Sequence, residues 1–97
     1  MEKNGKGKYY EFCKDFLPYG PRLIYEGEYL NGEKNGKGKN YYDYNGKLEF
    51  EGEYLNGERN GKGKEYDWSS GKLNFEGVYL NGKKMVMEKN IIGVVEN

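Results

Sequence analysis

The chain has 97 residues, with 16 lysines and arginines against 16 aspartates and glutamates, so its formal net charge is zero. This length allows one domain, or one block of a repeat array, with a thin core. The balanced charge gives no broad attraction to nucleic acid. Alanine is absent, whereas there are 16 glycines and 11 tyrosines. This composition excludes a helical bundle and favours a β-structure that buries aromatic rings.

The first residues are polar and rich in glycine, and no apolar stretch follows them, so they do not form a signal peptide. The single cysteine, Cys13, cannot form an intrachain disulfide and requires no oxidising compartment. No apolar run is long enough to span a membrane. We therefore expect a cytoplasmic location, with attachment to the membrane or the cytoskeleton left open.

The chain repeats itself. The block Glu-Gly-x-Tyr-Leu-Asn-Gly occurs three times, with its first glycine at Gly27, Gly52 and Gly77, a spacing of 25 residues. A second block, Asn-Gly-Lys-Gly-Lys, begins at residues 4, 35 and 60, so its first interval is 31 residues. The six extra residues predict an enlarged loop around residues 15–21, which contain both prolines.

Each unit predicts a hairpin. Large aromatics alternate with charges in residues 50–55, the pattern of a half-buried strand. Residues 56–61 contain two Asn-Gly pairs and predict the turn, the second strand begins near residue 62, and residues 69–72 turn into the next unit. With strands near residues 6, 23, 37, 48, 62, 73 and from 84 onward, we predict an all-β fold. It is an elongated single-layer antiparallel meander of about three and a half hairpin repeats.

We assign residues 1–84 to the repeat array, with units near 1–24, 25–49, 50–74 and 75–84. Residues 85–97 depart from the repeat, because apolar residues replace the expected Gly-x-Gly. They predict a terminal cap, or alternatively a docking strand for another chain, since an apolar edge invites pairing. The apolar residues concerned are Met85, Val86, Met87, Ile91 and Ile92.

The repeated aromatics and glycines are interpreted as structural. We expect the rings to stack from unit to unit, and Gly38 and Gly63 to leave room for a ring from the neighbouring strand. Simple alternation puts Gly63 and Tyr66 on opposite faces, so we predict a β-bulge at the glycines that returns Tyr66 to the inner face. The structural set is Tyr25, Gly27, Tyr29, Gly32, Gly36, Gly38, Phe50, Gly52, Tyr54, Gly57, Gly61, Gly63, Phe75, Gly77, Tyr79 and Gly82.

Two surfaces are candidates for contact with other molecules. Aromatic residues on the second strands, Tyr10, Tyr41, Tyr66 and Trp68, suit a protein partner. The lysines Lys37, Lys39, Lys62 and Lys64 suit anionic lipid headgroups. Glutamates on the adjacent strands argue against lipid binding, because cross-strand pairs would neutralise these lysines.

The sequence offers few residues from which a catalytic or metal site could be built. The chain has no histidine and one cysteine, and its carboxylates follow strand alternation on an open sheet. Paired catalytic carboxylates need a cleft that holds them close and shifts one pKa. We expect no enzyme activity, no cofactor and no metal.

The pattern Phe/Tyr-Glu-Gly-Glu-Tyr-x-x-Gly-x-x-x-Gly-x-Gly resembles the membrane occupation and recognition nexus (MORN) repeat. Residues 25–38 and 50–63 match it throughout, residues 75–82 match its first half, and Gly5 and Gly7 match its second. Residues 42–48 are similar to the longer variant in bacterial antitoxin-like proteins. The resemblance implies a twisted single-layer antiparallel sheet that binds or organises other components and performs no catalysis.

We therefore expect an interaction or assembly scaffold that contacts a protein partner or its own copies. The alternatives are a peripheral membrane module that binds anionic phospholipid, and a regulatory segment of a larger enzyme. The abundance of lysine, asparagine and tyrosine without alanine also suggests an A/T-biased genome, such as that of a protist.

Overall fold

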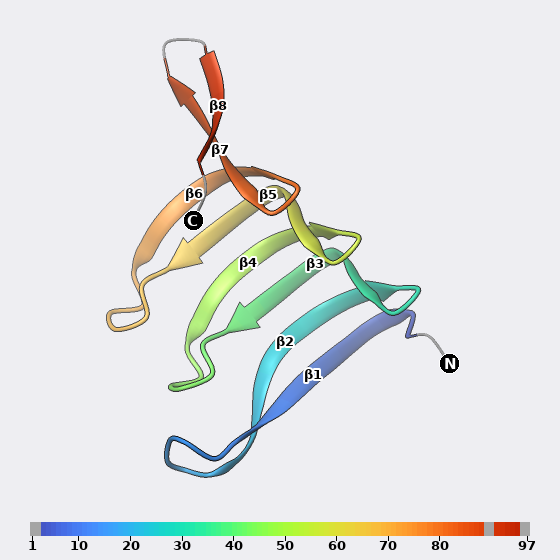
Figure 1. Ribbon diagram of the computed structural model, residues 1–97, viewed down its shortest axis with the longest axis vertical. Helices are drawn as coiled ribbons and strands as arrows, with labels where there is room; N and C mark the ends of the chain where they lie inside the picture. The colour runs from blue at the N-terminus through green and yellow to red at the C-terminus, as the bar shows by residue number, and fades with distance from the viewer. Residues whose placement is uncertain (1–2, 89–90, 96–97) are drawn as a thin grey trace.

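The computed structural model describes residues 3–88 and 91–95, with side chains through residue 85. It contains eight strands: β1 (Gly5–Cys13), β2 (Gly20–Leu30), β3 (Glu33–Tyr41), β4 (Leu48–Leu55), β5 (Glu58–Tyr66), β6 (Leu73–Leu80), β7 (Lys83–Glu88) and β8 (Ile91–Val95). They form one antiparallel sheet in chain order (Figure 1), which confirms the predicted meander. The described residues include no helix, and so none that could cross a membrane.

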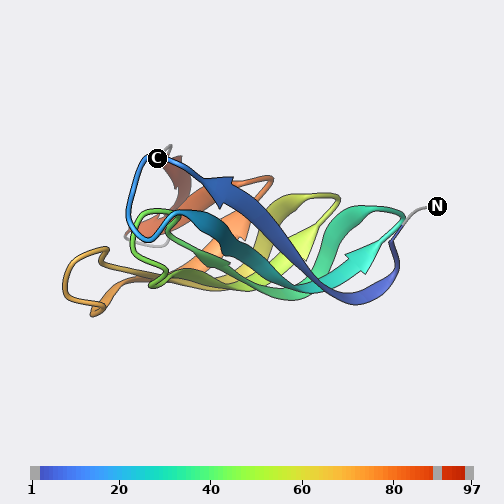
Figure 2. The ribbon, with the colours of Figure 1, turned by 90° about the horizontal axis from the view of Figure 1, so that it is seen from below.

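The sheet is a single curved and twisted layer, as the edge-on view shows (Figure 2). Its overall dimensions are 47 × 36 × 17 Å. No second layer of secondary structure covers either face within the described part of the chain. The core therefore consists of side chains that lie on the sheet itself.

Two-residue turns join the strands within each hairpin repeat. Asn56 has a φ of 52° and Gly57 a φ of 87°, the left-handed conformations that a tight hairpin turn requires. The preceding unit holds this turn: the Gly57 amide donates to the Lys34 carbonyl (2.9 Å) and the Asn56 amide donates to the Asn35 side chain (3.4 Å). The turns at residues 31–32 and 81–82 are held in the same way.

The turn is shorter than predicted. Only Asn56 and Gly57 connect β4 to β5, and the second Asn-Gly pair lies inside β5. Gly61 adopts a φ of 104° there, at a shift in the β4–β5 register. Asn60 is not part of a turn. Its side chain accepts a hydrogen bond from the Asn81 amide of the next unit (3.1 Å). The second pair therefore forms a bulge and a contact between units.

The predicted bulge is present, but its expected effect on Tyr66 is wrong. The shift at Gly61 precedes Gly63, and β5 then alternates regularly to Tyr66. The other irregularity near Tyr66 leaves Asn74 of β6 unpaired, so the extra residue is on the neighbouring strand. Tyr66 consequently remains on the face opposite to the one that Gly63 faces.

Six aromatic rings form the core. Tyr25, Phe50, Tyr54 and Tyr79 are buried, and Tyr29 and Phe75 pack against them at the two ends of the row. The contacts are edge-to-face within and between units: the Phe50 ring lies 5.5 Å from that of Tyr54 and 5.2 Å from that of Tyr79. Phe50 is therefore buried between a ring of its own unit and a ring of the next unit.

The rings lie on a row of glycines that crosses the sheet. The glycines face one another across the strand pairs in the order Gly7, Gly27, Gly38, Gly52, Gly63 and Gly77. A Cβ on Gly63 would lie 2.5 Å from a Phe50 ring atom, and a Cβ on Gly38 would overlap the Tyr25 ring. Any larger side chain at these positions would displace the core.

Candidate interaction surfaces

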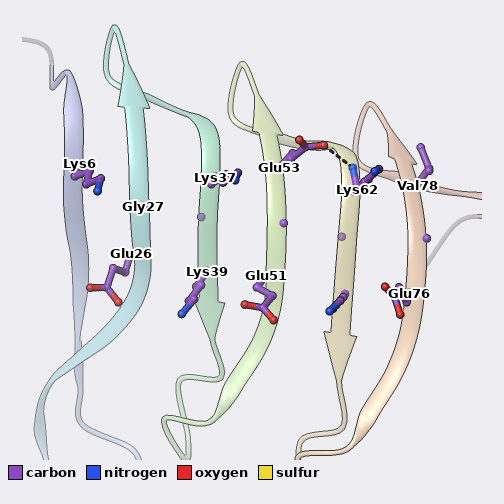
Figure 3. Close-up of a pocket in the computed structure, with 15 residues that line it drawn as sticks. Lys6, Glu26, Gly27, Lys37, Lys39, Glu51, Glu53, Lys62, Glu76 and Val78 are labelled. Carbon is purple, nitrogen blue, oxygen red and sulfur yellow. Dashed lines mark hydrogen bonds between the residues drawn. The ribbon is translucent and has the colours of Figure 1, made fainter.

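Lysines and glutamates cover the face opposite to the rings, which we call the charged face. Its residues flank the glycine row on both sides and line a shallow groove of about 1110 Å³ (Figure 3). One flank pairs across six strands with alternating charge, in the order Lys8, Glu26, Lys39, Glu51, Lys64 and Glu76. The candidate lipid-contact lysines Lys39 and Lys64 are therefore each placed between two glutamates.

The other flank uses its glutamates to close the bulges. The Glu53 carboxylate accepts from the Lys62 backbone amide (2.7 Å), and Glu28 accepts from that of Lys37 at the same distance. In the third unit Val78 stands at this position and pairs with Met85 of β7. The candidate lysines Lys37 and Lys62 thus lie on the same flank as glutamates that accept hydrogen bonds from the backbone amides of these two lysines.

Tyr41 and Tyr66 also belong to the charged face. Their hydroxyls donate to Glu26 (3.2 Å) and Glu51 (2.5 Å), and both tyrosines are half-buried. The hydrogen bond to Glu51 raises the pKa of Tyr66 to about 12, with burial adding to it. Of the four aromatic residues expected to contact a partner, these two instead have their hydroxyls hydrogen-bonded to glutamates of the sheet.

Cations cover the aromatic face, an arrangement that the sequence reasoning missed. The Arg59 guanidinium lies 4.0 Å from the centre of the Phe50 ring, and the Lys34 ammonium lies 4.7 Å from that of Tyr25. Lys84 stands over Phe75 in the same way, at 4.8 Å. Burial is the main cause of the lowered pKa of Lys34. The signal was present, because a cation recurs every 25 residues at positions 34, 59 and 84.

A hollow of about 340 Å³ on the aromatic face holds an ion-pair network. Glu65 accepts from Arg59 (3.1 Å) and Lys84 (3.0 Å), and the Tyr79 hydroxyl donates to it. Burial alone would raise the pKa of Glu65, but the hydrogen bonds from Tyr79 and Lys84 outweigh it and lower that pKa. These charges are paired with one another, and the described residues contain no acidic, histidine or cysteine cluster that could hold a metal.

The long connections of the sheet meet along one end, which we call the loop edge. It comprises residues 14–19, 42–47 and 67–72, which connect β1 to β2, β3 to β4 and β5 to β6 (Figure 1). The ring of Tyr44 lies 6.1 Å from that of Phe16 and 5.9 Å from that of Trp68. These three rings, which we call the loop-edge row, cross all three connections. This row joins segments that are about 25 residues apart in sequence.

Hydrogen bonds hold the loop edge together. Arg22 donates to the carbonyls of Pro18 and Asp43 (both 3.0 Å), and Asn45 donates to the Trp68 carbonyl (2.8 Å). In the third connection Asp67 accepts from the amides of residues 69 and 70, and these bonds lower its pKa to about 2. The apolar side chains at this edge are consequently presented from a fixed backbone.

Large apolar side chains of the loop edge are exposed. Leu17 is 75% exposed, Tyr19 63% and Trp68 54%, and Phe12 at the end of β1 is 70% exposed. Trp68 and the similarly exposed Tyr10 were the expected partner-contact residues that the structure leaves accessible. The others were missed, although an insertion rich in Phe, Leu and Tyr is visible in the sequence.

The expected contact residues of the tail are only partly described. Met85 pairs with Val78 of β6 on one side and with Val94 of β8 on the other. Val86, Met87, Ile91 and Ile92 lie in these two strands, and their side chains are outside the described part of the chain.

A family comparison agrees with this geometry. The MORN repeat model matches residues 25–43 and 50–72, which are the β2–β3 and β4–β5 hairpins with their following connections. The chain contains two MORN repeats over these residues. No curated protein and no solved structure matches it. MORN repeats are commonly interaction or membrane-binding modules and are generally non-catalytic.

Proposed function

We propose that this MORN protein is a non-catalytic scaffold that binds a protein partner through its loop edge. The observation that carries the proposal is the loop-edge row on a hydrogen-bonded backbone, in which Phe16 and Trp68 are exposed and the half-buried Tyr44 lies between them. Clustered, exposed aromatic side chains mark protein interfaces because they bury a large area at small entropic cost. A fixed backbone lowers the ordering cost further.

The charged face supports phospholipid binding less well. A lipid surface recognises an excess of positive charge, whereas lysines and glutamates alternate along this groove. Lys8 also forms an ion pair with Glu26 (3.8 Å). The charges therefore compensate one another instead of presenting a basic surface.

The test compares two surface variants as baits for proximity labelling in the cells from which the protein comes. The loop-edge variant carries Phe16→Ser, Leu17→Ser and Trp68→Ser, and the control carries Lys37→Ser and Lys62→Ser on the charged face. We expect the loop-edge variant to lose the proteins that the native chain and the control both label. Circular dichroism of the purified baits shows that each variant keeps its sheet.

Two results would refute the proposal. In one, the loop-edge variant retains the labelled proteins and the control loses them, which assigns binding to the charged face. In the other, the native chain co-sediments with anionic phospholipid vesicles and the loop-edge variant does not, which makes the loop-edge row a membrane anchor.

A further inference from the structure

The hairpins within the two complete repeats show which strand the outer edge of a repeat's first strand accepts. β2 receives β3 and β4 receives β5 in the same register, with Gly52 opposite Gly63 and Glu51 opposite Lys64. The sequence Gly-Lys-Gly-Lys of the added strand supplies both the glycine and the charge. β6 is the third strand of this kind and carries the corresponding Glu76 and Gly77.

The outer edge of β6 is only partly covered. β7 pairs with Val78, Tyr79 and Leu80 through Lys83–Met85, and beyond Met85 it pairs with β8 alone and leaves β6 (Figure 1). Among the described residues, positions 73 and 75–77 pair with β5 alone. A Cβ on Gly52 would meet the Gly63 backbone at 2.6 Å, whereas the three atoms nearest to a Cβ on Gly77 all belong to the ring of Phe75.

β1 has the sequence and the open edge that fit this position. Residues 2–8 are identical to residues 33–39 of β3. β1 also pairs with β2 as β3 pairs with β4, with Gly7 opposite Gly27 and Gly38 opposite Gly52. Its other edge, which corresponds to the edge that β3 offers to β2, has no strand beside it in the described structure.

The two ends of the core row of rings, Tyr29 and Phe75, also fit each other as rings of consecutive units do. Between units, Tyr25 contacts Tyr54 at 5.3 Å and Phe50 contacts Tyr79 at 5.2 Å. Phe75 has only the ring of its own unit, Tyr79, at 5.7 Å. Tyr29 at the other end likewise has only Tyr25, at 5.3 Å. Each terminal ring is half-buried and lacks a neighbouring unit.

We propose that copies of this chain assemble head to tail, with β1 of one copy added to the open part of β6 of another. Gly7 of the second copy lies opposite Gly77, its Lys8 opposite Glu76, and its Tyr29 packs against Phe75. In the β2–β3 register Lys3 of the second copy falls opposite Tyr79, so at the junction it replaces Lys84 there and β7 is released from the edge of β6. This continues the glycine row, the charge alternation and the aromatic row across the junction. The contact is heterologous and does not close, so it builds linear chains of molecules. It uses residues outside the loop edge and does not depend on partner binding there.

Cysteine cross-linking tests the register. On a Cys13→Ser background, a Glu76→Cys chain is mixed with a Lys8→Cys chain and oxidised. Paired residues of adjacent strands lie within disulfide range, so we expect a covalent heterodimer. The matched control is Lys39→Cys, which has the same local sequence but lies on the interior strand β3. We expect its cross-link with Glu76→Cys to fall to the background of random collision.

Sedimentation velocity of the native chain over a concentration series is the second measurement. We expect a sedimentation coefficient that rises without reaching a plateau, and its loss in Glu76→Lys. Mixing Glu76→Lys with Lys8→Glu should restore association as alternating chains, because both kinds of junction between the unlike variants carry opposite charges, whereas each variant alone places like charges there. Equal cross-linking of Lys8→Cys and Lys39→Cys, or a native chain that is monomeric throughout, would overturn the proposal and leave loop-edge binding unaffected.

Discussion

The aromatic row makes the stability of the sheet sensitive to a single ring in its middle. Phe50 is completely buried, contacts two tyrosines edge-to-face and lies under the Arg59 guanidinium. Replacing a buried phenylalanine by alanine costs about 3–5 kcal/mol, of which each lost ring pair accounts for roughly 0.5–1.5 kcal/mol. A domain of this length has a free energy of unfolding of about 5–15 kcal/mol. Phe50→Ala should therefore remove a large share of it.

The end of the row provides the matched control. Phe75 occupies the same position one unit later, but it is half-buried and contacts a single ring, Tyr79. We expect Phe75→Ala to cost about half as much as Phe50→Ala, roughly 1.5–2.5 kcal/mol. Urea unfolding followed by circular dichroism at low protein concentration measures both losses. Equal losses for the two variants, or a loss below about 1 kcal/mol for Phe50→Ala, would refute burial by neighbouring units.

Three further predictions concern the glycine row, the buried hydroxyls and the bulge. Gly63→Ala should lower the free energy of unfolding by about 1–3 kcal/mol, because its Cβ would lie 2.5 Å from the Phe50 ring; an unchanged urea midpoint would contradict this overlap. Burial, the main cause, raises the pKa of Tyr25 to about 12 from about 10 in the unfolded chain, so the stabilisation is complete below pH 10 and is lost as the pH rises through 12. Tyrosinate absorbance should then rise together with loss of the sheet signal, and complete tyrosine ionisation near pH 10 in an intact sheet would argue against it. Glu53→Ala should cost about 1 kcal/mol by removing the acceptor of the Lys62 amide and should speed hydrogen exchange at that amide, whereas unchanged exchange would show that the carboxylate is dispensable.

The repeat made much of the fold predictable. The 25-residue spacing, the alternation of aromatics with charges and the Asn-Gly pairs predicted the antiparallel meander. The second Asn-Gly pair was misassigned because a glycine with positive φ serves both a turn and a bulge, and only strand pairing distinguishes the two. Gly61 belongs to the bulge. The error at Tyr66 has the same origin, since the unpaired residue is on the adjacent strand.

The surfaces were less predictable than the fold. Trp68 and Tyr10 could be selected from their residue types, but the loop edge depends on contacts between connections that are far apart in the sequence. The ring contacts of Arg59 and Lys34 were hidden for another reason. A lysine or arginine beside a turn is usually a solvated charge, and its long stem can lie along a ring only when the next unit places that ring beneath it.

A single-layer sheet has no opposing layer to bury its rings, and this determines how its units depend on one another. Tyr25 and Phe50 each lie on a glycine of the adjacent strand and against a ring of the adjacent unit, so their burial depends on the contact between units. Stability then follows the number of contacts between units, as in other linear arrays. The terminal rings, Tyr29 and Phe75, each lack one such contact. Any segment that continues the array at either end, including another copy of the chain, would bury a ring that the isolated sheet leaves half in water. The open strand edges and the incomplete rings thus coincide at the same two ends of the molecule.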